Sequence, residues 1–312
     1  MPPARDRTAR MVLLSAERRA LLNKTSEQLT VIREVVVCSI MSIFTFYCVF
    51  WCSSFEYRFQ NRAMSMVFGP FLFTLLTIIL AIYTQWWQKR GYRIRMYLNI
   101  IVLMLVATVA GFSLGDWNFW RTTAPYYTYM DMATYVNVDS GLDKGGAFMD
   151  AGRVFFKEST YVARNRALAF RNGDRYCVAP IIRQPLLNQD GTDQQQTYSY
   201  WVLPKSGSVD WWAVGKNCCG EDGSEFNCGE VDSALARSGL RLLSDKDRDN
   251  YLLAVEEWVG TTGLPARHPL FFTWTKDPVA SVRRLHLDAW NMFWLLLLLY
   301  SIATAFMLFI LY

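Results

Sequence analysis

The chain has 312 residues, of which 52% are hydrophobic and only 19% charged, a balance that indicates that part of it lies in lipid. Its net charge of +5 arises from the N-terminal tail and the short loops beside apolar runs, a pattern that suits membrane lipid as a partner and disfavours nucleic acid. We therefore expect an integral membrane protein.

Four apolar runs predict transmembrane helices. Each is long enough to cross about 30 Å of hydrocarbon as a helix, and none contains Lys, Arg or Glu. The runs are 35–53, 66–86, 97–115 and 289–312. Because ionisable residues inside a bilayer mark ion paths and proton relays, their absence from these runs disfavours a transporter, although not a subunit of one.

The distribution of basic residues predicts how the spans are oriented. Lys and Arg are frequent in tail 1–34 and in the loop between the second and third spans, whereas the first loop has only Arg58 and Arg62. The positive-inside rule therefore places both termini in the cytoplasm and segment 116–288 on the other side. The first span begins too late and runs too long for a cleavable signal, so we expect secretory insertion, with the plasma membrane or secretory pathway preferred over an organelle membrane. Thr25 and Gln28 have capping-box spacing ahead of this span.

One face of the third span carries small residues at every fourth position. Ala107, Gly111 and Gly115 would let another helix approach closely. We expect this face to pack within the bundle, with dimerisation as the alternative.

Segment 116–288 reads as an extracytoplasmic domain of mixed α+β structure, rich in strands. β-branched and aromatic runs broken by turn residues predict antiparallel strands, which are listed here as 153–156, 160–163, 167–170, 176–182, 197–203 and 209–214. A helix should follow up to Gly260, capped by Ser244 and with Asp245 and Asp247 at its positive end.

Four cysteines in this segment predict two disulfides, because the compartment is expected to be oxidising. They are Cys177, Cys218, Cys219 and Cys228. A bond between adjacent Cys218 and Cys219 would strain the ring, so one of them is expected to pair with Cys177 and the other with Cys228. A zinc site is the competing interpretation, but adjacent cysteines fit the usual ligand spacing poorly, and we expect neither a metal nor a cofactor.

Two resemblances follow from these features. Four spans with a large second outer loop that contains Cys218, Cys219 and Gly220 resemble the tetraspanin layout, which implies lateral organisation of membrane partners. Tetraspanin loops are helical and place their other cysteines after this motif, whereas Cys177 precedes it. A second resemblance rests on segments 212–215, 236–241 and 268–272, together with Cys218, Cys219, Phe226 and Cys228. These are similar to uncharacterised multi-span proteins of dinoflagellate algae, a resemblance that implies no activity.

No catalytic motif accompanies this layout. His268 reads as a loop or packing residue, and Asp139 with Asp143 reads as a solvated turn rather than a Ca²⁺ loop. Aromatic residues are the candidates for partner binding, with core packing as the alternative: Trp211, Trp212, Phe271, Phe272 and Trp274. We therefore expect a non-enzymatic scaffold or recognition protein that binds protein partners. The alternatives are an accessory subunit of a transport or channel complex, and an enzyme with an unrecognised site.

Overall fold

The computed structural model describes residues 4–88, 95–183, 204, 206–220 and 225–311, which form two compact units. The first unit, here the helical unit, comprises Met1–Ala124 and Leu287–Tyr312. The second, here the sheet domain, is Pro125–His286. The strand expected at 197–203 lies outside the described residues.

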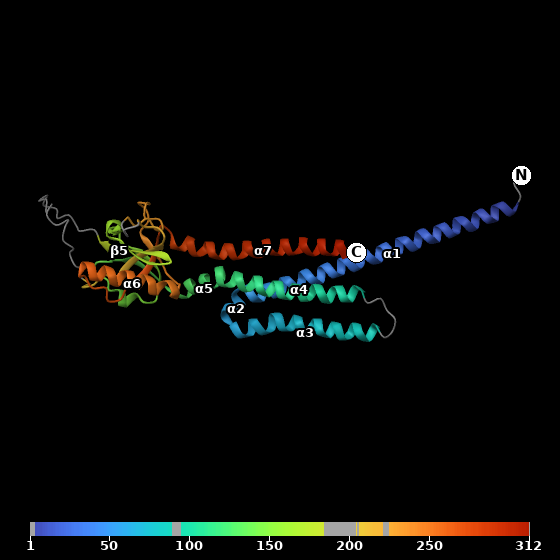
Figure 1. Ribbon diagram of the computed structural model, residues 1–312, viewed down its shortest axis with the longest axis horizontal. Coiled ribbons are helices and arrows are strands. Elements are labelled where there is room, and N and C mark those ends of the chain that lie inside the picture. Colours follow the sequence, from blue (N-terminus) through green and yellow to red (C-terminus); the bar gives the residue numbers. More distant parts are fainter. Residues whose placement is uncertain (1–3, 89–94, 184–203, 205, 221–224, 312) are drawn as a thin grey trace. The chain divides into compact units, whose positions relative to one another are not determined.

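Four helices in the described part of the chain are long and apolar enough to cross a membrane, as the apolar runs predict. These candidate spans are Val31–Ser54, Ala63–Tyr83, Leu98–Asp131 and Pro278–Ile310. The helices that contain them are α1 (Ala4–Ser54), α3 (Arg62–Gln88), α4 (Arg95–Asn118) with its continuation, and α7 (Pro278–Leu311), drawn in Figure 1. A short helix, α2 (Glu56–Gln60), joins α1 to α3.

All four helices are longer than the apolar runs indicated, and α7, for example, begins at Pro278 rather than at residue 289. The helix α1 runs unbroken from Ala4 to Ser54, so the capping box expected at Thr25 and Gln28 begins no new helix there. The third span continues past residue 115 through a π-helical turn, η1 (Phe119–Thr123), into α5 (Ala124–Asp131). An apolar run marks where a helix crosses lipid, but polar residues beyond the run can continue the helix, here by way of a π-helical turn.

The sheet domain is built on one eight-stranded sheet with the order β1-β2-β7-β8-β6-β5-β3, and β4 also pairs with β5. The strands are β1 (Ala133–Val138), β2 (Ala151–Phe156), β3 (Thr160–Val162), β4 (Leu168–Asn172), β5 (Asp174–Arg183), β6 (Trp211–Lys216), β7 (Ser238–Arg241) and β8 (Leu270–Thr275). Short 3₁₀ turns lie at η2 (Gly145–Phe148) and η3 (Arg164–Arg166). The α+β fold between the third and fourth spans is thereby confirmed.

The expectation of purely antiparallel pairing is wrong in part. The pairs β1/β2 and β6/β8 are parallel, whereas the pairs β5/β6 and β7/β8 are antiparallel. Parallel neighbours need a long crossover, and the chain between β6 and β8 supplies one through β7 and the helix α6 (Asp245–Thr262). Local strand patterns do not reveal such connections.

Two cores lie on opposite faces of the sheet. The helix α6 covers one face, where Tyr251, Val255 and Trp258 pack on sheet residues such as Trp212 and Phe271. The other face carries its own cluster. The start of α6 follows the sequence closely: Ser244 accepts a hydrogen bond from the Asp247 amide, and Gly263 ends the helix with a φ of 69°.

Candidate functional site

The cysteines of the sheet domain form the two disulfides that the sequence predicts. Cys177 on β5 is bonded to Cys219, with a Cα–Cα distance of 6.0 Å. Cys218 is bonded to Cys228, with a Cα–Cα distance of 5.1 Å. Each member of the adjacent pair thus bonds to a different, distant cysteine, and the sequence separations of the two bonds are 42 and 10 residues.

The two disulfides lie against each other in the core on the face opposite α6. The Sγ atoms of Cys177, Cys218 and Cys228 all lie within 4.8 Å of one another. Gly215 on β6 is opposite Cys177 in the sheet, and a Cβ at Gly215 would lie 2.6 Å from Cys218 Sγ and 2.7 Å from Cys228 Sγ. A side chain at Gly215 would therefore displace the cysteine cluster.

Two arginines hold the segment that carries these cysteines. Arg175 on β5 donates to the carbonyl oxygen of Cys219 at 2.7 Å. Arg164 donates through Nε to the carbonyl oxygen of Phe226 at 2.9 Å and also pairs with Asp232 at 2.6 Å. Two cations thus lie beside the backbone of the cysteine cluster.

The aromatic residues singled out for partner binding all lie in the interior. They are Trp211 at 1% exposed, Trp212 at 0%, Phe271 at 3%, Phe272 at 0% and Trp274 at 3%. Successive side chains of a strand point to opposite faces, so Trp211 and Phe272 pack in the core with the cysteines while Trp212 and Phe271 pack under α6. In this structure these rings fill cores and present no surface.

The small-residue face of the third span packs on α1. Ala107 is buried, and a Cβ at Gly111 would lie 3.1 Å from the carbonyl oxygen of Phe46. A Cβ at Gly115 would lie 2.9 Å from Ser53 Cβ. The face therefore serves packing inside the helical unit.

An ion pair between a buried arginine and a partly exposed aspartate in the helical unit is one feature that the sequence did not indicate. Arg58 in α2 is 1% exposed, and its guanidinium pairs with the carboxylate of Asp116 in α4. The same group donates to the Ser53 carbonyl oxygen at 2.8 Å and lies 4.3 Å from the centroid of the Phe119 ring. Among the described residues, Arg58 Nε is a buried donor without a hydrogen-bond partner. Both charges flank apolar runs, which is the only signal that the sequence offered.

A polar network continues from this pair. The Asn118 side chain donates to Ser54 Oγ at 2.6 Å and to the Ala289 carbonyl oxygen at 3.2 Å, which ties α4 to α1 and α7. Thr122 in turn donates to the Asn118 carbonyl oxygen at 2.7 Å within the π-helical turn. The network therefore coincides with a departure from α-helical geometry, and π-helical turns of this kind are frequent at functional sites.

The expected solvated turn at Asp139 and Asp143 is wrong, because Asp139 is buried. Its carboxylate pairs with Arg183 at 2.9 Å and Lys157 at 3.4 Å. Asp143 accepts a hydrogen bond from the Asp139 amide at 2.8 Å. Both carboxylates therefore serve to fix the chain between β1 and β2.

Asp210 plays a similar role, which the sequence did not indicate. Its carboxylate accepts hydrogen bonds from the amides of Gly145, Arg267 and His268, at 2.9, 3.1 and 3.2 Å. His268 is thus an exposed loop residue whose backbone amide donates to Asp210; the structure agrees with the loop interpretation and not with packing.

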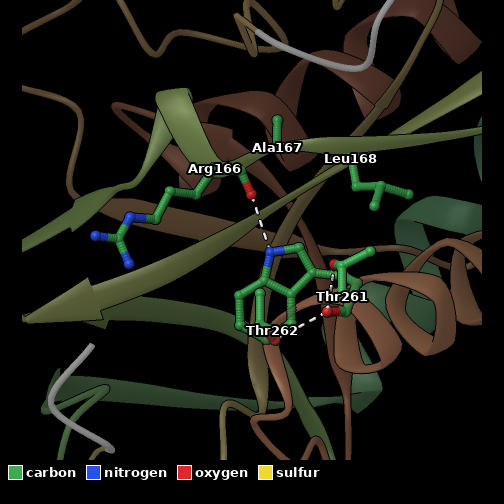
Figure 2. Close-up of a pocket in the computed structure, with 6 residues that line it drawn as sticks. Arg166, Ala167, Leu168, Thr261 and Thr262 are labelled. Carbon is green, nitrogen blue, oxygen red and sulfur yellow. Dashed lines mark hydrogen bonds between the residues drawn. The ribbon is translucent and has the colours of Figure 1, made fainter. Parts of the chain in front are cut away.

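A pocket between η3 and the end of α6 has a volume of about 240 Å³. This is smaller than the roughly 300 Å³ of the smallest pockets that bind drug-sized ligands. Figure 2 shows Thr261 and Thr262 facing Arg166, Ala167 and Leu168 across it. The Trp258 indole donates to the Arg166 carbonyl oxygen at 3.0 Å, and both threonine hydroxyls donate to the Trp258 carbonyl oxygen. The polar groups of the pocket thus bond within its own wall.

Comparisons of the chain with family models, with curated proteins and with solved structures found no match, so neither the tetraspanin nor the dinoflagellate resemblance gains support from them.

Proposed function

We propose that this protein is a non-enzymatic membrane scaffold whose sheet domain lies on the extracytoplasmic side and binds a protein partner there. Both termini lie in the cytoplasm in this proposal, and the membrane is the plasma membrane or one of the secretory pathway. The two disulfides support the extracytoplasmic placement, because such bonds persist in oxidising compartments.

The observation that carries the partner-binding part is an exposed apolar surface along β1, the strand at one end of the sheet. It consists of Val136 at 70% exposed, Leu142 at 45% and Met149 at 51%, here called the β1 edge surface. Two hydrogen bonds place its outer members at opposite ends of β1: Leu142 N donates to Asp139 O at 3.0 Å, and Ala133 N donates to Asp150 O at 3.1 Å. From these three exposed apolar side chains on and beside the end strand of the sheet, we infer that a partner binds along this edge.

The interior of the domain supports a binding role rather than catalysis. The buried carboxylates of Asp139 and Asp210 are engaged by cations or backbone amides, which makes them part of a rigid framework. A framework fixed in this way lowers the entropy cost of presenting a surface to a partner.

A photo-crosslinking amino acid at Val136, placed in the native membrane, tests the proposal. We expect it to capture a recurring partner chain, and the triple variant Val136→Lys, Leu142→Lys, Met149→Lys should abolish copurification of that chain. The control is Leu235→Lys, because Leu235 is 66% exposed on the same domain but outside the β1 edge surface. Exposed substitutions change stability by about 0.5 kcal/mol or less, so folding should be retained.

Copurification that survives the triple variant would rule out this surface. Ion flux or turnover by the purified protein alone in liposomes would overturn the scaffold role and favour one of the alternatives.

A further inference from the structure

The four cysteines of the sheet domain are close enough together to form a second kind of site. Three of their sulfur atoms, those of Cys177, Cys218 and Cys228, lie within 4.8 Å of one another, and the fourth, on Cys219, is bonded to that of Cys177. We propose that reduction of both disulfides converts this cluster into a binding site for a single Zn²⁺ ion with four thiolate ligands.

The geometry suits zinc because three of the sulfurs already lie close together. Zinc binds four thiolates tetrahedrally with Zn–S distances of about 2.3 Å, which places the sulfurs about 3.8 Å apart. The Sγ atoms of Cys177, Cys218 and Cys228 lie within 4.8 Å of one another, so sulfurs that are not bonded need to approach by about 1 Å at most, and the two sulfurs of each opened disulfide need to move apart to the same spacing. Rotation about the cysteine side chains can supply both changes. Adjacent cysteines argued against zinc in the sequence, but the fold bonds Cys219 to Cys177 and brings Cys177 beside Cys218 and Cys228.

The charge around the cluster also fits a metal. Because Gly215 has no Cβ, the sulfurs of Cys218 and Cys228 can lie against β6 at this point. A zinc ion with four thiolates carries a net charge of −2. Arg175, which donates to the Cys219 carbonyl oxygen, offsets part of this charge from the adjoining backbone, whereas the charge of Arg164 is balanced by Asp232.

The chemistry balances when a dithiol reductant is the co-reactant. Each disulfide accepts two electrons and two protons from one dithiol, which becomes a disulfide in turn, so that reduction yields four thiols. Zinc binds thiolates, and the four thiol protons are released to solvent as it binds. Reoxidation by two molecules of an external disulfide reverses the exchange: they take up the four electrons and four protons from solvent to become dithiols, the two protein disulfides form again and the metal is released.

The test uses the full-length protein in detergent, with Cys48→Ser and Cys52→Ser introduced so that the free thiols of α1 do not contribute a pair of ligands. The protein is reduced anaerobically with a phosphine, supplied with Zn²⁺ and desalted, and its metal content and thiols are measured. We expect one zinc ion per chain after reduction and none in the oxidised protein. Co²⁺ in place of zinc should give the visible spectrum of tetrahedral cobalt thiolate.

Matched variants locate the site. Cys177→Ser and Cys228→Ser should each abolish stoichiometric zinc, although the two residues belong to different disulfides. Arg175→Gln should weaken zinc binding about tenfold, the effect typical of losing an outer-shell partner. Arg171→Gln is the control, because Arg171 faces Arg175 across the β4/β5 pair and is exposed.

Three outcomes would overturn the proposal. The first is a reduced protein that has four additional thiols but retains no stoichiometric zinc. This outcome counts even if reduction unfolds the domain, because zinc binding to the site would stabilise the folded form. The second is zinc retained in both serine variants. The third is an octahedral cobalt spectrum, which would indicate oxygen ligands.

Discussion

The guanidinium of Arg58 pairs with the carboxylate of Asp116 inside the helical unit, and the two partners differ in exposure, at 1% for Arg58 and 36% for Asp116. This difference predicts unequal costs of removing them. Asp116→Ala leaves a buried cation without a counter-charge, which costs roughly 3 kcal/mol. Arg58→Met should cost less, because the Asp116 carboxylate that it leaves unpaired reaches solvent and because the methionine side chain fills most of the volume of the arginine. Thermal unfolding in detergent should show the larger loss for Asp116→Ala.

The double variant is the sharper measurement. Arg58→Met should restore part of the stability lost in Asp116→Ala, because it removes the unpaired cation. Glu56→Ala is the control, since Glu56 is an exposed acidic residue of the same short helix, α2. Equal and additive losses for the two single variants would show that the pair does not act as a unit.

Gly115 should tolerate no large side chain, because its contact with α1 is already close. A Cβ there would lie 2.9 Å from Ser53 Cβ and 3.1 Å from the Phe50 carbonyl oxygen, so Gly115→Leu must push α1 and α4 apart. We expect a loss of about 1–3 kcal/mol or more, seen as a lower midpoint of thermal unfolding. Val109→Leu is the control on the same helix, since Val109 is 67% exposed. An unchanged midpoint for Gly115→Leu would contradict the packing of this face on α1.

Local signals in the sequence predicted the elements whose structure depends on nearby residues. The capped start of α6 follows from Ser244 and Asp247, and the β4/β5 hairpin follows from Gly173, which adopts a φ of 72° at the turn. For the disulfides, the sequence reduced the possible pairings to two but could not say whether Cys218 or Cys219 is bonded to Cys177. The final choice depends on Cys177 lying opposite Gly215 across the β5/β6 pair, a register that no spacing along the chain reveals.

Features set by distant contacts escaped prediction. The strand β8 was treated as an aromatic segment that could bind a partner, and only its place between β7 and β6 shows that both its faces are covered. The partnership of Arg58 and Asp116 joins residues on either side of two spans, so neither charge looked unusual alone. Asp139 looked solvated because its partners, Lys157 and Arg183, lie on later segments.

The two disulfides should differ in their contribution to stability. They close loops with sequence separations of 42 and 10 residues, for which the chain-entropy estimate gives about 4 and about 3 kcal/mol. The double variant Cys177→Ala, Cys219→Ala should therefore lose more stability in denaturant than Cys218→Ala, Cys228→Ala. Cys48→Ala, which removes a free cysteine of α1, is the control.

Peptide mapping without reductant should support the same pairing. Cleavage between Cys219 and Cys228 should leave three peptides joined by disulfides, and fragmentation between Cys218 and Cys219 should then show Cys218 linked to Cys228 and Cys219 linked to Cys177. Free thiols at these positions in the protein isolated from membranes, or a reversed order of stability losses, would contradict the oxidised form described above.

Glu230 should make the sheet domain sensitive to acid. Hydrogen bonds from the Lys276 amide and the Thr275 hydroxyl lower the pKa of the Glu230 carboxyl below its ordinary value of 4.5. A carboxyl whose pKa is lowered in the folded state adds stability that is fully present above its unfolded value and is lost as the pH falls through its folded value. The stability difference between wild type and Glu230→Gln should therefore be constant near neutral pH and shrink below about pH 4.5.

Neighbouring variants on β8 separate this effect from general acid unfolding. Thr275→Ala removes one of the two donors and should reduce the pH dependence, whereas Thr273→Ala, at an exposed position of the same strand, should leave it unchanged. A difference between wild type and Glu230→Gln that is the same at every pH would show that these hydrogen bonds do not favour the charged form.

The orientation of the chain is the prediction on which the extracytoplasmic role depends. An epitope at residue 1 and another at residue 191 should show opposite protection from protease in sealed vesicles. The positive charge of the tail and of the loop between the second and third spans should keep these two segments in the cytoplasm, which puts residue 191 on the other side. Replacing Lys89, Arg90 and Arg93 with glutamine should weaken that bias and yield a mixed population. Replacing Arg283 and Arg284, which lie near the start of α7 on the side that we predict to be extracytoplasmic, should leave the orientation intact. Equal protection of the two epitopes in the wild type would contradict an odd number of spans between them, and with it the placement of the sheet domain outside the cytoplasm.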